Sequence, residues 1–426
     1  MPEVSVLIPA YNVEPYIREC LDSVLGQTMG DLEVICIDDA STDRTAEILR
    51  EYERKDPRIR VYSQEKNKGQ SCGRNLALSH ASGRYIYMLD SDDMIRREAL
   101  EELLEICKSQ DLDAAGFETH LFTNNDELRK EASAKTIVYE ERPVMNGRDG
   151  LIYCMEQDVF SLSVPTFIMK REYLEKIGIK FVECILHEDV GYIFELISRA
   201  DRIQFLHREL FLRRLRPHST MTGGFSDKNI EGYLKSFVRS FELEPMLKEK
   251  YGQNMVFQKA VQKWRRDIFG RIRQLYLQSE ETIYFQEGGH VDEEIRRLFQ
   301  IVKLTSSGKA RARDILGEDL HVLVSSLSEG SGSEAPQIYL CGTGQYAERM
   351  MDLAGAVDLV IRGVLVTEKD RNAFRGFPVI GIDREAALSD KEKEIPVILS
   401  VSRYKREEYE EKLEQAGYRH IIHVRF

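Results

Sequence analysis

The sequence lacks any apolar run that approaches the ~20 residues a helix needs to span a membrane. Its first residues also lack the basic, apolar and small-residue pattern of a secretory signal peptide. We therefore expect a cytoplasmic protein. The protein could contact the inner face of the cell membrane through a basic amphipathic helix at residues 263–273. The alternative is that this helix faces a partner or the solvent.

The sequence also lacks an excess of positive charge and any cysteine spacing that suggests pairing. The net charge of −12 argues against a nucleic-acid partner, because contacts to phosphates need basic patches. It leaves room for a local basic face at residues 213–216. The seven cysteines are scattered, odd in number and never in C-x-x-C spacing. This spacing predicts that the cysteines are reduced residues of the core, and it argues against a disulfide framework or a zinc site.

The remaining composition is that of an ordinary globular protein, with 42% hydrophobic and 31% charged residues. A chain of 426 residues is too long for one compact core, so we expect two or three domains. In the first hundred residues, β-branched runs at 4–9, 32–37, 59–62 and 85–89 alternate with amphipathic segments at 16–25, 44–54 and 71–79. This alternation predicts an α/β domain with a mainly parallel sheet that binds ligands beyond the carboxyl ends of its strands.

The pattern changes after about residue 225. Apolar residues recur at helical spacing over 230–241 and 261–275, which predicts helices that pack through these stripes. The Ser- and Gly-rich stretch at 325–336 is typical of a linker, and strand–helix alternation resumes at 337. We therefore expect a catalytic domain at 1–225, a helical domain and linker at 226–330, and a small α/β domain at 331–426.

The strongest chemical signal is the acidic run Asp90-Ser91-Asp92-Asp93, directly after the predicted strand at 85–89. Three carboxylates at one strand end repel one another unless a positive group joins them. A divalent cation held by a diphosphate is such a group, because Mg²⁺ and Mn²⁺ prefer oxygen ligands shared between carboxylates and phosphates. The alternative is a solvated acidic turn that caps the next helix.

Three further motifs precede this run in order: VSVLIPAYN at 4–12, IDDASTD at 37–43 and NKGQSCGRN at 67–75. Together the four motifs resemble the family 2 glycosyltransferases over about residues 3–222. The resemblance implies the GT-A fold, followed here by a helical segment and a small Rossmann-like domain. It also implies a metal-dependent, inverting transfer of a sugar from a nucleotide-sugar to an acceptor hydroxyl.

The resemblance gives the first two motifs nucleotide-facing roles. The first loop that faces the nucleotide would consist of Pro9, Ala10, Tyr11 and Asn12, with Tyr11 stacking near the base. Glu14 is expected near the ribose. Asp39 would accept a hydrogen bond from the base, a contact that usually reads uracil in this family, so a UDP-sugar is the expected donor. The alternative for Asp38 and Asp39 is a cap on the following helix.

The other donor contacts come from the third and fourth motifs. Gly69 would allow close approach of the backbone, and Arg74 would steady the site or touch phosphate. Asp90 and Asp92 match the two acids of the D-x-D motif, with Ser91 between them. Both acids are expected to bind Mn²⁺ or Mg²⁺, with Asp92 as the direct ligand.

A second catalytic signal is His187-Glu188-Asp189. The family has an E-D pair at this distance, with the aspartate as general base, which implies that role for Asp189 with Glu188 beside it. An inverting transfer needs one carboxylate to take the proton of the acceptor hydroxyl as its oxygen attacks the anomeric carbon. On the residues alone, both acids could instead favour a helix N-terminus.

The basic segment at 211–222 resembles the family loop with the pattern aromatic-Arg-x-Arg-x-x-Ser, which closes over the diphosphate. Arg214 and Arg216 are expected to bind the phosphates, since guanidinium groups suit planar, bidentate contacts. Ser219 and His218 would assist them. A solvated basic patch is the alternative.

In the last domain, the run LCGTGQYA at 340–347 follows a predicted strand and opens a helix, the context for a G-x-G-x-x-A turn. No clear ribose-binding acid ends the second strand, and the segment is too short for a full dehydrogenase. A structural or oligomerising domain is therefore favoured over a working nucleotide site.

The predicted function is the synthesis of a surface glycan, a polysaccharide or a lipid-linked oligosaccharide. The expected partners are a nucleotide-sugar donor and a glycan or lipid-linked acceptor, whereas a homo-oligomer stays open. Two other functions remain: a nucleotidyltransferase on the same type of fold, and a non-catalytic assembly protein. The donor sugar, the acceptor and the linkage cannot be read from these motifs.

Overall fold

The computed structural model describes residues 1–125, 128, 136–216 and 227–278, together with parts of the stretch from 295 to 423. The chain divides into two compact units, Met1–Trp264 and Arg265–Phe426. Their boundary falls inside one long helix, α11 (Met255–Gln278). The linker predicted at 325–336 lies outside the described residues. Within the described part of the chain, no helix is long and apolar enough to cross a membrane.

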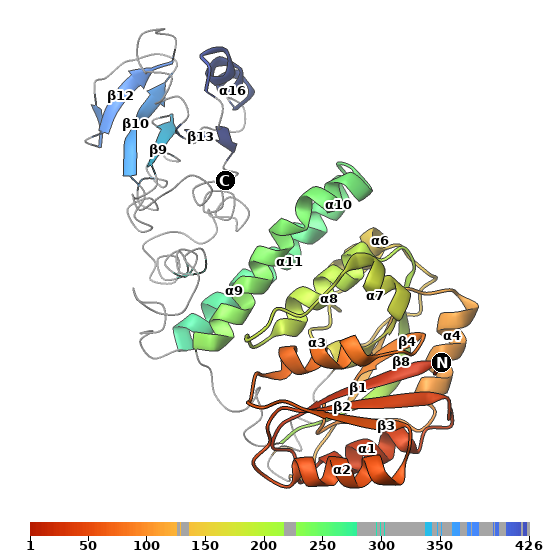
Figure 1. The fold of residues 1–426 in the computed structure, drawn as a ribbon. Helices are drawn as coiled ribbons and strands as arrows, with labels where there is room; N and C mark the ends of the chain where they lie inside the picture. Colours follow the sequence, from red (N-terminus) through yellow and green to blue (C-terminus); the bar gives the residue numbers. More distant parts are fainter. Residues whose placement is uncertain are drawn as a thin grey trace. The chain divides into compact units, whose positions relative to one another are not determined.

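The first unit is built on one eight-stranded sheet with the order β3-β2-β1-β4-β7-β6-β8-β5 (Figure 1). Its strands are β1 (Val4–Ala10), β2 (Leu32–Asp38), β3 (Ile59–Ser63), β4 (Tyr85–Met88), β5 (Met94–Ile95), β6 (Ala114–Phe122), β7 (Phe167–Lys170) and β8 (Ile203–Arg214). Its helices are α1 (Ile17–Leu25), α2 (Thr45–Lys55), α3 (Gln70–His80), α4 (Ala99–Ser109), α6 (Gly147–Glu156), α7 (Arg171–Ile177), α8 (Glu188–Arg199), α9 (Asp227–Glu242) and α10 (Glu244–Tyr251), with a 3-10 turn, η2, at Val164–Thr166.

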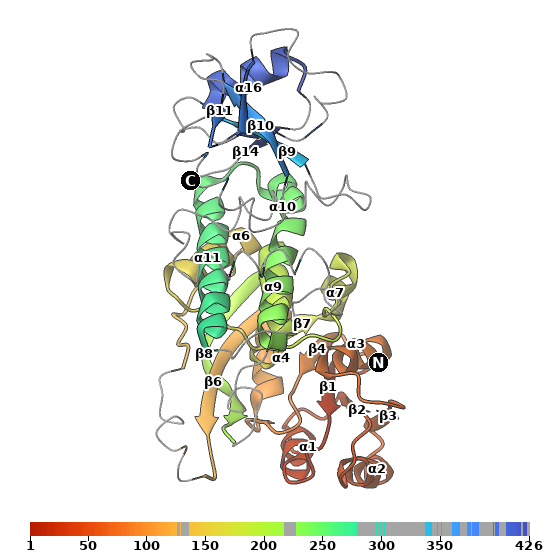
Figure 2. The same cartoon turned by 90° about the vertical axis from the view of Figure 1, so that its left-hand side faces the viewer.

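The sheet is mainly parallel, as predicted. β1 pairs in parallel with β2 and β4, and β2 pairs in parallel with β3. Within this sheet β7 and β5 run against the other strands, since β7 is antiparallel to β4 and β6, and β5 is antiparallel to β8. The long strands β6 and β8 lie side by side (Figure 2). The carboxyl ends of β1, β2 and β4 therefore share one edge, which carries the predicted site.

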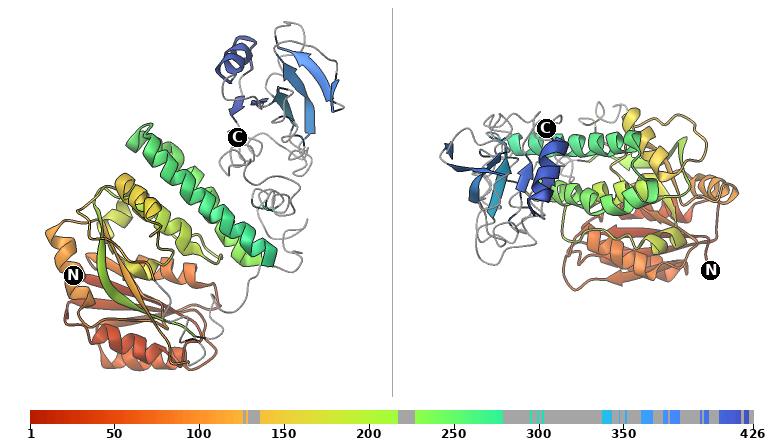
Figure 3. Two further views of the ribbon diagram at one scale, coloured as in Figure 1. Left: turned by 180° about the vertical axis from the view of Figure 1, so that it is seen from behind. Right: turned by 90° about the horizontal axis from the view of Figure 1, so that it is seen from above.

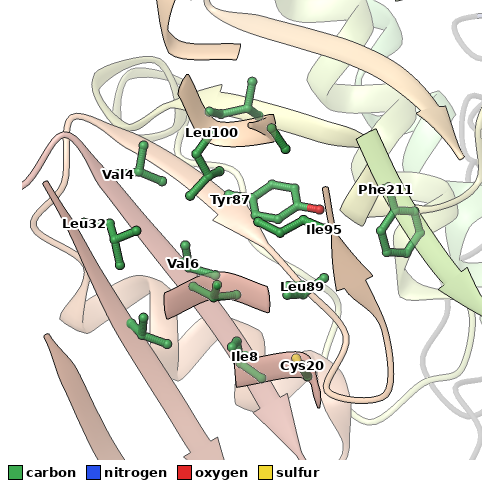
Figure 4. Close-up of a cluster of buried hydrophobic side chains, with 14 of the residues drawn as sticks. Val4, Val6, Ile8, Cys20, Leu32, Tyr87, Leu89, Ile95, Leu100 and Phe211 are labelled. Carbon is green, nitrogen blue, oxygen red and sulfur yellow. The ribbon is translucent and has the colours of Figure 1, made fainter. Parts of the chain in front are cut away.

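Helices cover both faces of the parallel half, as Figures 1 and 3 show. β1 is buried along its whole length, and its alternate residues Val4, Val6 and Ile8 pack with α1, α2 and α4 in one apolar cluster (Figure 4). Helix α3 covers β1 and β2 from the other face. A strand buried on both faces needs a nearly continuous apolar run, and the one polar residue at 4–8, Ser5, is buried and donates a hydrogen bond to Glu33 Oε1 at 2.5 Å.

The helical stripes are core residues, as predicted. The stripe in α9 is buried, and so is the stripe in α11: Ile230, Tyr233, Phe237, Phe241, Val261, Trp264, Ile268, Ile272 and Leu275. All seven cysteines are free, and all except Cys184 are buried. The prediction of core cysteines is therefore wrong for Cys184, which lies in the segment between α7 and α8 instead of an apolar element.

The second unit contains a six-stranded sheet with the order β11-β12-β10-β9-β13-β14. Its described elements are β9 (Gln337–Cys341), β10 (Val360–Val366), β11 (Ala373–Phe374), β12 (Phe377–Gly381), β13 (Val397–Leu399), α16 (Arg406–Gln415) and β14 (Ile421–His423). β9 pairs in parallel with β10 on one side and with β13 on the other, so the strand order reverses at β9, as in Rossmann-like sheets. Gly342 follows β9 with φ 106°, and residues 343–346 of the predicted turn lie outside the described residues.

Candidate active site

Two loops meet at the carboxyl edge of the sheet, one after β1 and one after β2. Asn12 joins them: its Oδ1 accepts a hydrogen bond from the Thr42 backbone N–H at 2.8 Å, and its own N–H donates to Ser41 Oγ at 3.2 Å. Asn12 itself has a left-handed backbone with φ 50°, a conformation that asparagine tolerates better than most residues. The sequence placed Asn12 against the nucleotide, and the structure makes it a brace between the two loops.

The other predicted residues of the first loop differ in their exposure to solvent. Glu14 accepts a hydrogen bond from the Arg44 backbone N–H at 3.1 Å, so its carboxylate is turned toward the start of α2. Ala10 is buried at the end of β1, whereas the Tyr11 side chain is 44% exposed. Pro9 packs on α3, because a Cβ placed on Gly73 would lie 3.1 Å from the Pro9 Cβ. Tyr11 is therefore the residue of this loop that is best placed to stack on a ligand.

Asp39 is buried and holds the third motif in place. Its Oδ1 accepts hydrogen bonds from Gln64 Nε2 at 2.7 Å and from the Lys68 N–H at 2.8 Å, and its Oδ2 accepts one from the Gly69 N–H at 2.7 Å. Gly69 has φ 87°, a conformation in which a side chain would be strained. A carboxylate has about four lone-pair positions, so one remains for a base.

The centre of the site is the guanidinium of Arg74, which is almost completely buried. Its Nη2 donates to Asp90 Oδ1 at 2.7 Å, and its Nη1 donates to Glu188 Oε1 at 2.9 Å and to Asp189 Oδ1. Two catalytic motifs that lie about a hundred residues apart in sequence therefore meet on one side chain. Gln70 Nε2 adds a further hydrogen bond to Asp90 Oδ1 at 2.6 Å.

Arg74 is held from several sides. The guanidinium carbon lies 5.3 Å from the centroid of the Phe181 ring, within the range of a cation–π contact. Its Nε has no hydrogen-bond partner among the described residues. Burial alone would lower the pKa of Arg74, but Asp189, Asp90 and Glu188 together raise it above its ordinary value. The guanidinium is therefore a fixed positive charge among acids.

The E-D pair lies at the start of α8, where Glu188 is buried and the Asp189 side chain is 15% exposed. Asp189 Oδ2 accepts a hydrogen bond from the Val164 N–H at 3.1 Å, so both of its oxygens are oriented. Burial raises the pKa of Asp189 above its ordinary value, and Arg74 opposes this shift. Burial likewise raises the pKa of Glu188 to about 7, again against the effect of Arg74. A raised pKa makes Asp189 a stronger base, and Arg74 favours its ionised form.

The acidic turn after β4 is fixed by strand pairing. β5 follows the turn and pairs with β8, with Met94 opposite Leu212, so residues beyond Leu212 come alongside the acids. The Arg214 backbone N–H donates to Asp93 Oδ1 at 2.7 Å, and Arg214 Nε donates to the Asp92 carbonyl at 2.9 Å. Arg216 Nε forms an ion pair with Asp92 Oδ2 at 2.6 Å.

The two arginines differ in exposure. Arg214 is buried, with its Nη2 on Glu19 Oε2 at 2.6 Å and its guanidinium against the rings of Phe122 and Tyr16. Arg216 is partly exposed and also lies over Tyr16. Arg214 is thus arranged to position the acidic turn, and Arg216 is the better placed of the two to meet a phosphate.

The residues present fit a divalent cation that arrives with a nucleotide. Asp90 and Asp92 share one turn, and Ser91 between them is buried. Across the described ranges, no group of three His, Cys, Asp or Glu side chains is arranged to hold a metal. Two carboxylates that complete their coordination with phosphate oxygens match the way Mg²⁺ is usually bound, so the phosphates would supply the remaining oxygen ligands.

Of three further predicted residues, one lies apart from this centre and two lie outside the described part of the chain. His187 has φ 60° and caps α8, and its Nε2 lies 2.9 Å from Asn229 Nδ2, which agrees with the structural role favoured by the sequence. Ser219 and His218 lie outside the described residues.

Several supporting residues were missed by sequence reasoning: Tyr16, Glu19, Gln70, Val164 and Phe181. Each contacts a predicted site residue; only Gln70 lies within one of the four motifs, at 67–75, and the motif gave it no role. The contact of Val164 with Asp189 is made by a backbone N–H, for which the sequence gives no signal. The pairing of Glu19 with Arg214 joins residues 195 positions apart, which spacing along the chain cannot reveal.

Comparison with known proteins agrees with this arrangement. The model of the family described as "Glycosyl transferase family 2" matches residues 5–178. Glycosyltransferase GlyG of Streptococcus pneumoniae is 30% identical over 227 residues, which cover 52% of this chain and 74% of that protein. The chain belongs to the family 2 glycosyltransferases. The predicted family and its GT-A fold are thereby confirmed.

Other similar proteins match smaller parts or only the shape. A putative teichuronic acid biosynthesis glycosyltransferase of Bacillus subtilis, TuaG, is 47% identical over 104 residues, which cover 24% of this chain and 41% of that protein. The chain covers between 14% and 63% of the length of three curated relatives, TuaG among them, which is less than two thirds in each case. The crystal structure of S. aureus TarS 1–349 with UDP-GlcNAc aligns at 20% identity with a TM-score of 0.49, over 78% of this chain and 93% of that one.

Replacement of Arg74 by Met should strongly destabilise the first unit. Removal of one partner from a buried charge cluster typically costs about 3–5 kcal/mol, because the remaining charges stay buried without compensation. Urea unfolding can be followed by tryptophan fluorescence, since the single tryptophan, Trp264, packs against Phe194 in this unit.

The matched control is Arg18→Met, which removes an arginine from a solvent-exposed pair with Glu51. Exposed pairs contribute little to stability, so the unfolding midpoint of this variant should stay close to that of the wild type. Equal shifts for the two variants would contradict the role assigned to Arg74.

Glu188 should make stability depend on pH near neutrality. Its pKa in the folded protein is about 7, above the ordinary 4.5, so the folded state binds the proton more tightly than the unfolded state. The free energy of unfolding should therefore rise as pH falls from about 8 to about 5. This contribution is absent in Glu188→Gln. The wild-type and variant urea midpoints, measured across that range, should converge or cross, and parallel pH curves would refute the assignment.

Proposed function

We propose that the protein transfers a sugar from a UDP-sugar to an acceptor hydroxyl, with inversion at the anomeric carbon and with a divalent cation bound beside the diphosphate. The observation that carries this proposal is the convergence of Asp90, Glu188 and Asp189 on the guanidinium of Arg74. Mere helix caps or a solvated acidic turn would not require a buried positive charge shared between the two motifs.

The donor would lie along the carboxyl edge of β1, β2 and β4. Tyr11 is exposed there and can stack on the base. The lone-pair position left on Asp39 suits the imide N–H of uracil, and this contact is the reason for proposing UDP. Asn12 and Glu14 hold the loops that frame the nucleotide.

The diphosphate would reach the acidic turn. The cation, when bound to Asp92 and Asp90, would supply positive charge that offsets the charge developing on the leaving diphosphate. Arg216 forms an ion pair with Asp92 and its side chain is partly exposed, so its guanidinium would lie within reach of a phosphate oxygen bound beside the turn. Arg214 would keep Asp92 and Asp93 in register through its backbone and Nε hydrogen bonds. Ser219 is proposed as an auxiliary.

Asp189 would act as the general base. Arg74 and the Val164 N–H orient its two oxygens, and its raised pKa favours uptake of the acceptor proton. With one base on one face of the sugar, the acceptor oxygen would displace the diphosphate in a single step. Glu188 shares Nη1 of Arg74 with Asp189 and would tune the charge of the pair.

A surface glycan, polysaccharide or lipid-linked oligosaccharide is the proposed product, and the name of the TuaG relative, which refers to teichuronic acid, supports this class. The Rossmann-like unit is proposed to be structural or oligomerising. A nucleotidyltransferase is the second candidate, since two acids beside a metal-bound diphosphate also serve nucleotide transfer.

The test combines nucleotide titration with transfer. Calorimetry with UDP, GDP, CMP and TDP, with and without Mn²⁺, should show binding of UDP that depends on manganese and is lost in Asp92→Asn. Asp189→Asn should bind UDP like the wild type but should transfer sugar about 10²–10⁴ times more slowly, the range expected for loss of general base catalysis.

Each outcome separates the candidates. Unchanged turnover in Asp189→Asn would remove the base assignment. Release of pyrophosphate from a nucleoside triphosphate and a sugar phosphate would favour the nucleotidyltransferase. Absence of binding for all four nucleotides would overturn the proposed donor site and favour an assembly protein.

A further inference from the structure

Two cysteines lie beside the candidate site without a part in the proposed chemistry. Cys72 is in the first turn of α3, two residues before Arg74, and its side chain is buried. Cys184 is in the segment between α7 and α8, five residues before Asp189, and it is the exposed one of the seven cysteines. One thiol is thus open to solvent, and the other lies behind it on the helix that carries Arg74.

The segment that carries Cys184 is fastened to α3 next to Cys72. Asn75 Nδ2 donates to the Phe181 carbonyl at 3.0 Å and to Glu183 Oε1 at 3.1 Å, and the Phe181 N–H donates back to Asn75 Oδ1 at 3.0 Å. Residues three apart on a helix share one face, so Cys72 lies on the face of α3 that Asn75 presents to this segment. Cys184 directly follows Glu183 in this segment.

Cys184 lies close enough to Cys72 to act on its thiol electrostatically. Burial raises the pKa of Cys72 to about 11, with Glu183 and Cys184 adding to the shift. Cys72 alone is therefore a poor target for reagents in solution, and the entry point is Cys184. Its backbone has φ 61°, a left-handed conformation that is unusual for cysteine.

We propose that Cys72 and Cys184 form a reversible disulfide by exchange with a small-molecule disulfide. The Cys184 thiolate attacks one sulfur of the reagent R–S–S–R, forms a mixed disulfide and releases one R–S⁻, which takes up a proton. The Cys72 sulfur, after losing its proton, then attacks the Cys184 sulfur and displaces the second R–S⁻. Two protein thiols are oxidised and one reagent disulfide is reduced to two thiols.

The disulfide would tie together the two halves of the site. Its S–S bond of about 2.05 Å is shorter than any non-bonded approach of two sulfur atoms, so closure draws the segment before Asp189 toward α3. A misplacement near 1 Å can cost a catalytic site a factor of about 10². We therefore expect the oxidised protein to transfer sugar at least about tenfold more slowly, and this consequence alone rests on the proposed function.

The test uses the full chain with glutathione disulfide, followed by acid quenching, non-reducing digestion and mass spectrometry. In the wild type we expect a linked peptide pair containing Cys72 and Cys184, which disappears after treatment with dithiothreitol. In Cys72→Ser the exchange should stop halfway, so that glutathione remains attached to Cys184. In Cys184→Ser, Cys72 should stay reduced because it is buried.

These readouts do not depend on sugar transfer, so they can fail independently of the proposed function. Stable glutathione on Cys184 of the wild type, with Cys72 still reduced, would overturn the pairing. So would an unmodified Cys184, or linkage of Cys184 to a cysteine other than Cys72. Circular dichroism of both serine variants verifies that they fold, and the exposed position of Cys184 makes Cys184→Ser the safer of the two.

Discussion

The buried guanidinium of Arg74 is the interaction on which the site depends. Three carboxylates reach it, and a buried carboxylate without a partner would become protonated or would destabilise the fold. Arg74 therefore allows the partly exposed Asp90 and Asp189 to remain close to each other beside the buried Glu188. It links the donor side of the site to the base, so the two cannot shift independently. The raised pKa values of Glu188 and Asp189 follow from the same burial.

The sheet brings the remaining parts to this centre. Parallel pairing of β1 with β2 and β4 places the loops with Asn12 and Asp39 and the acidic turn at one edge. The register of β5 against β8 then brings Arg214 and Arg216 alongside Asp92. Strand pairing thus positions both the acids and the basic residues that compensate them, and side-chain hydrogen bonds complete the arrangement.

The sequence predicted the local helices and strands well, because these depend on short-range patterns. The mainly apolar run of β1 and the helical stripe of α9 are read directly from the sequence. Side-chain partners could not be predicted, since they depend on tertiary packing. Arg214 was predicted to bind phosphate, and that role stays untested. Its guanidinium also contacts Glu19 of α1, the ring of Tyr16 just before α1 and the ring of Phe122 in β6, and the sequence predicted none of these contacts. The exposure of Cys184 has the same origin, because its segment follows no regular pattern.

The central claim is that Arg74 couples the two acids, and a double-mutant cycle on unfolding free energies tests it most directly. Asp90→Asn and Asp189→Asn should be non-additive by about 0.5–3 kcal/mol, as expected for groups that share one network. In an Arg74→Met background the coupling should change sign or vanish, since only repulsion between the two acids remains. Additivity within about 0.5 kcal/mol in the presence of Arg74 would contradict the account.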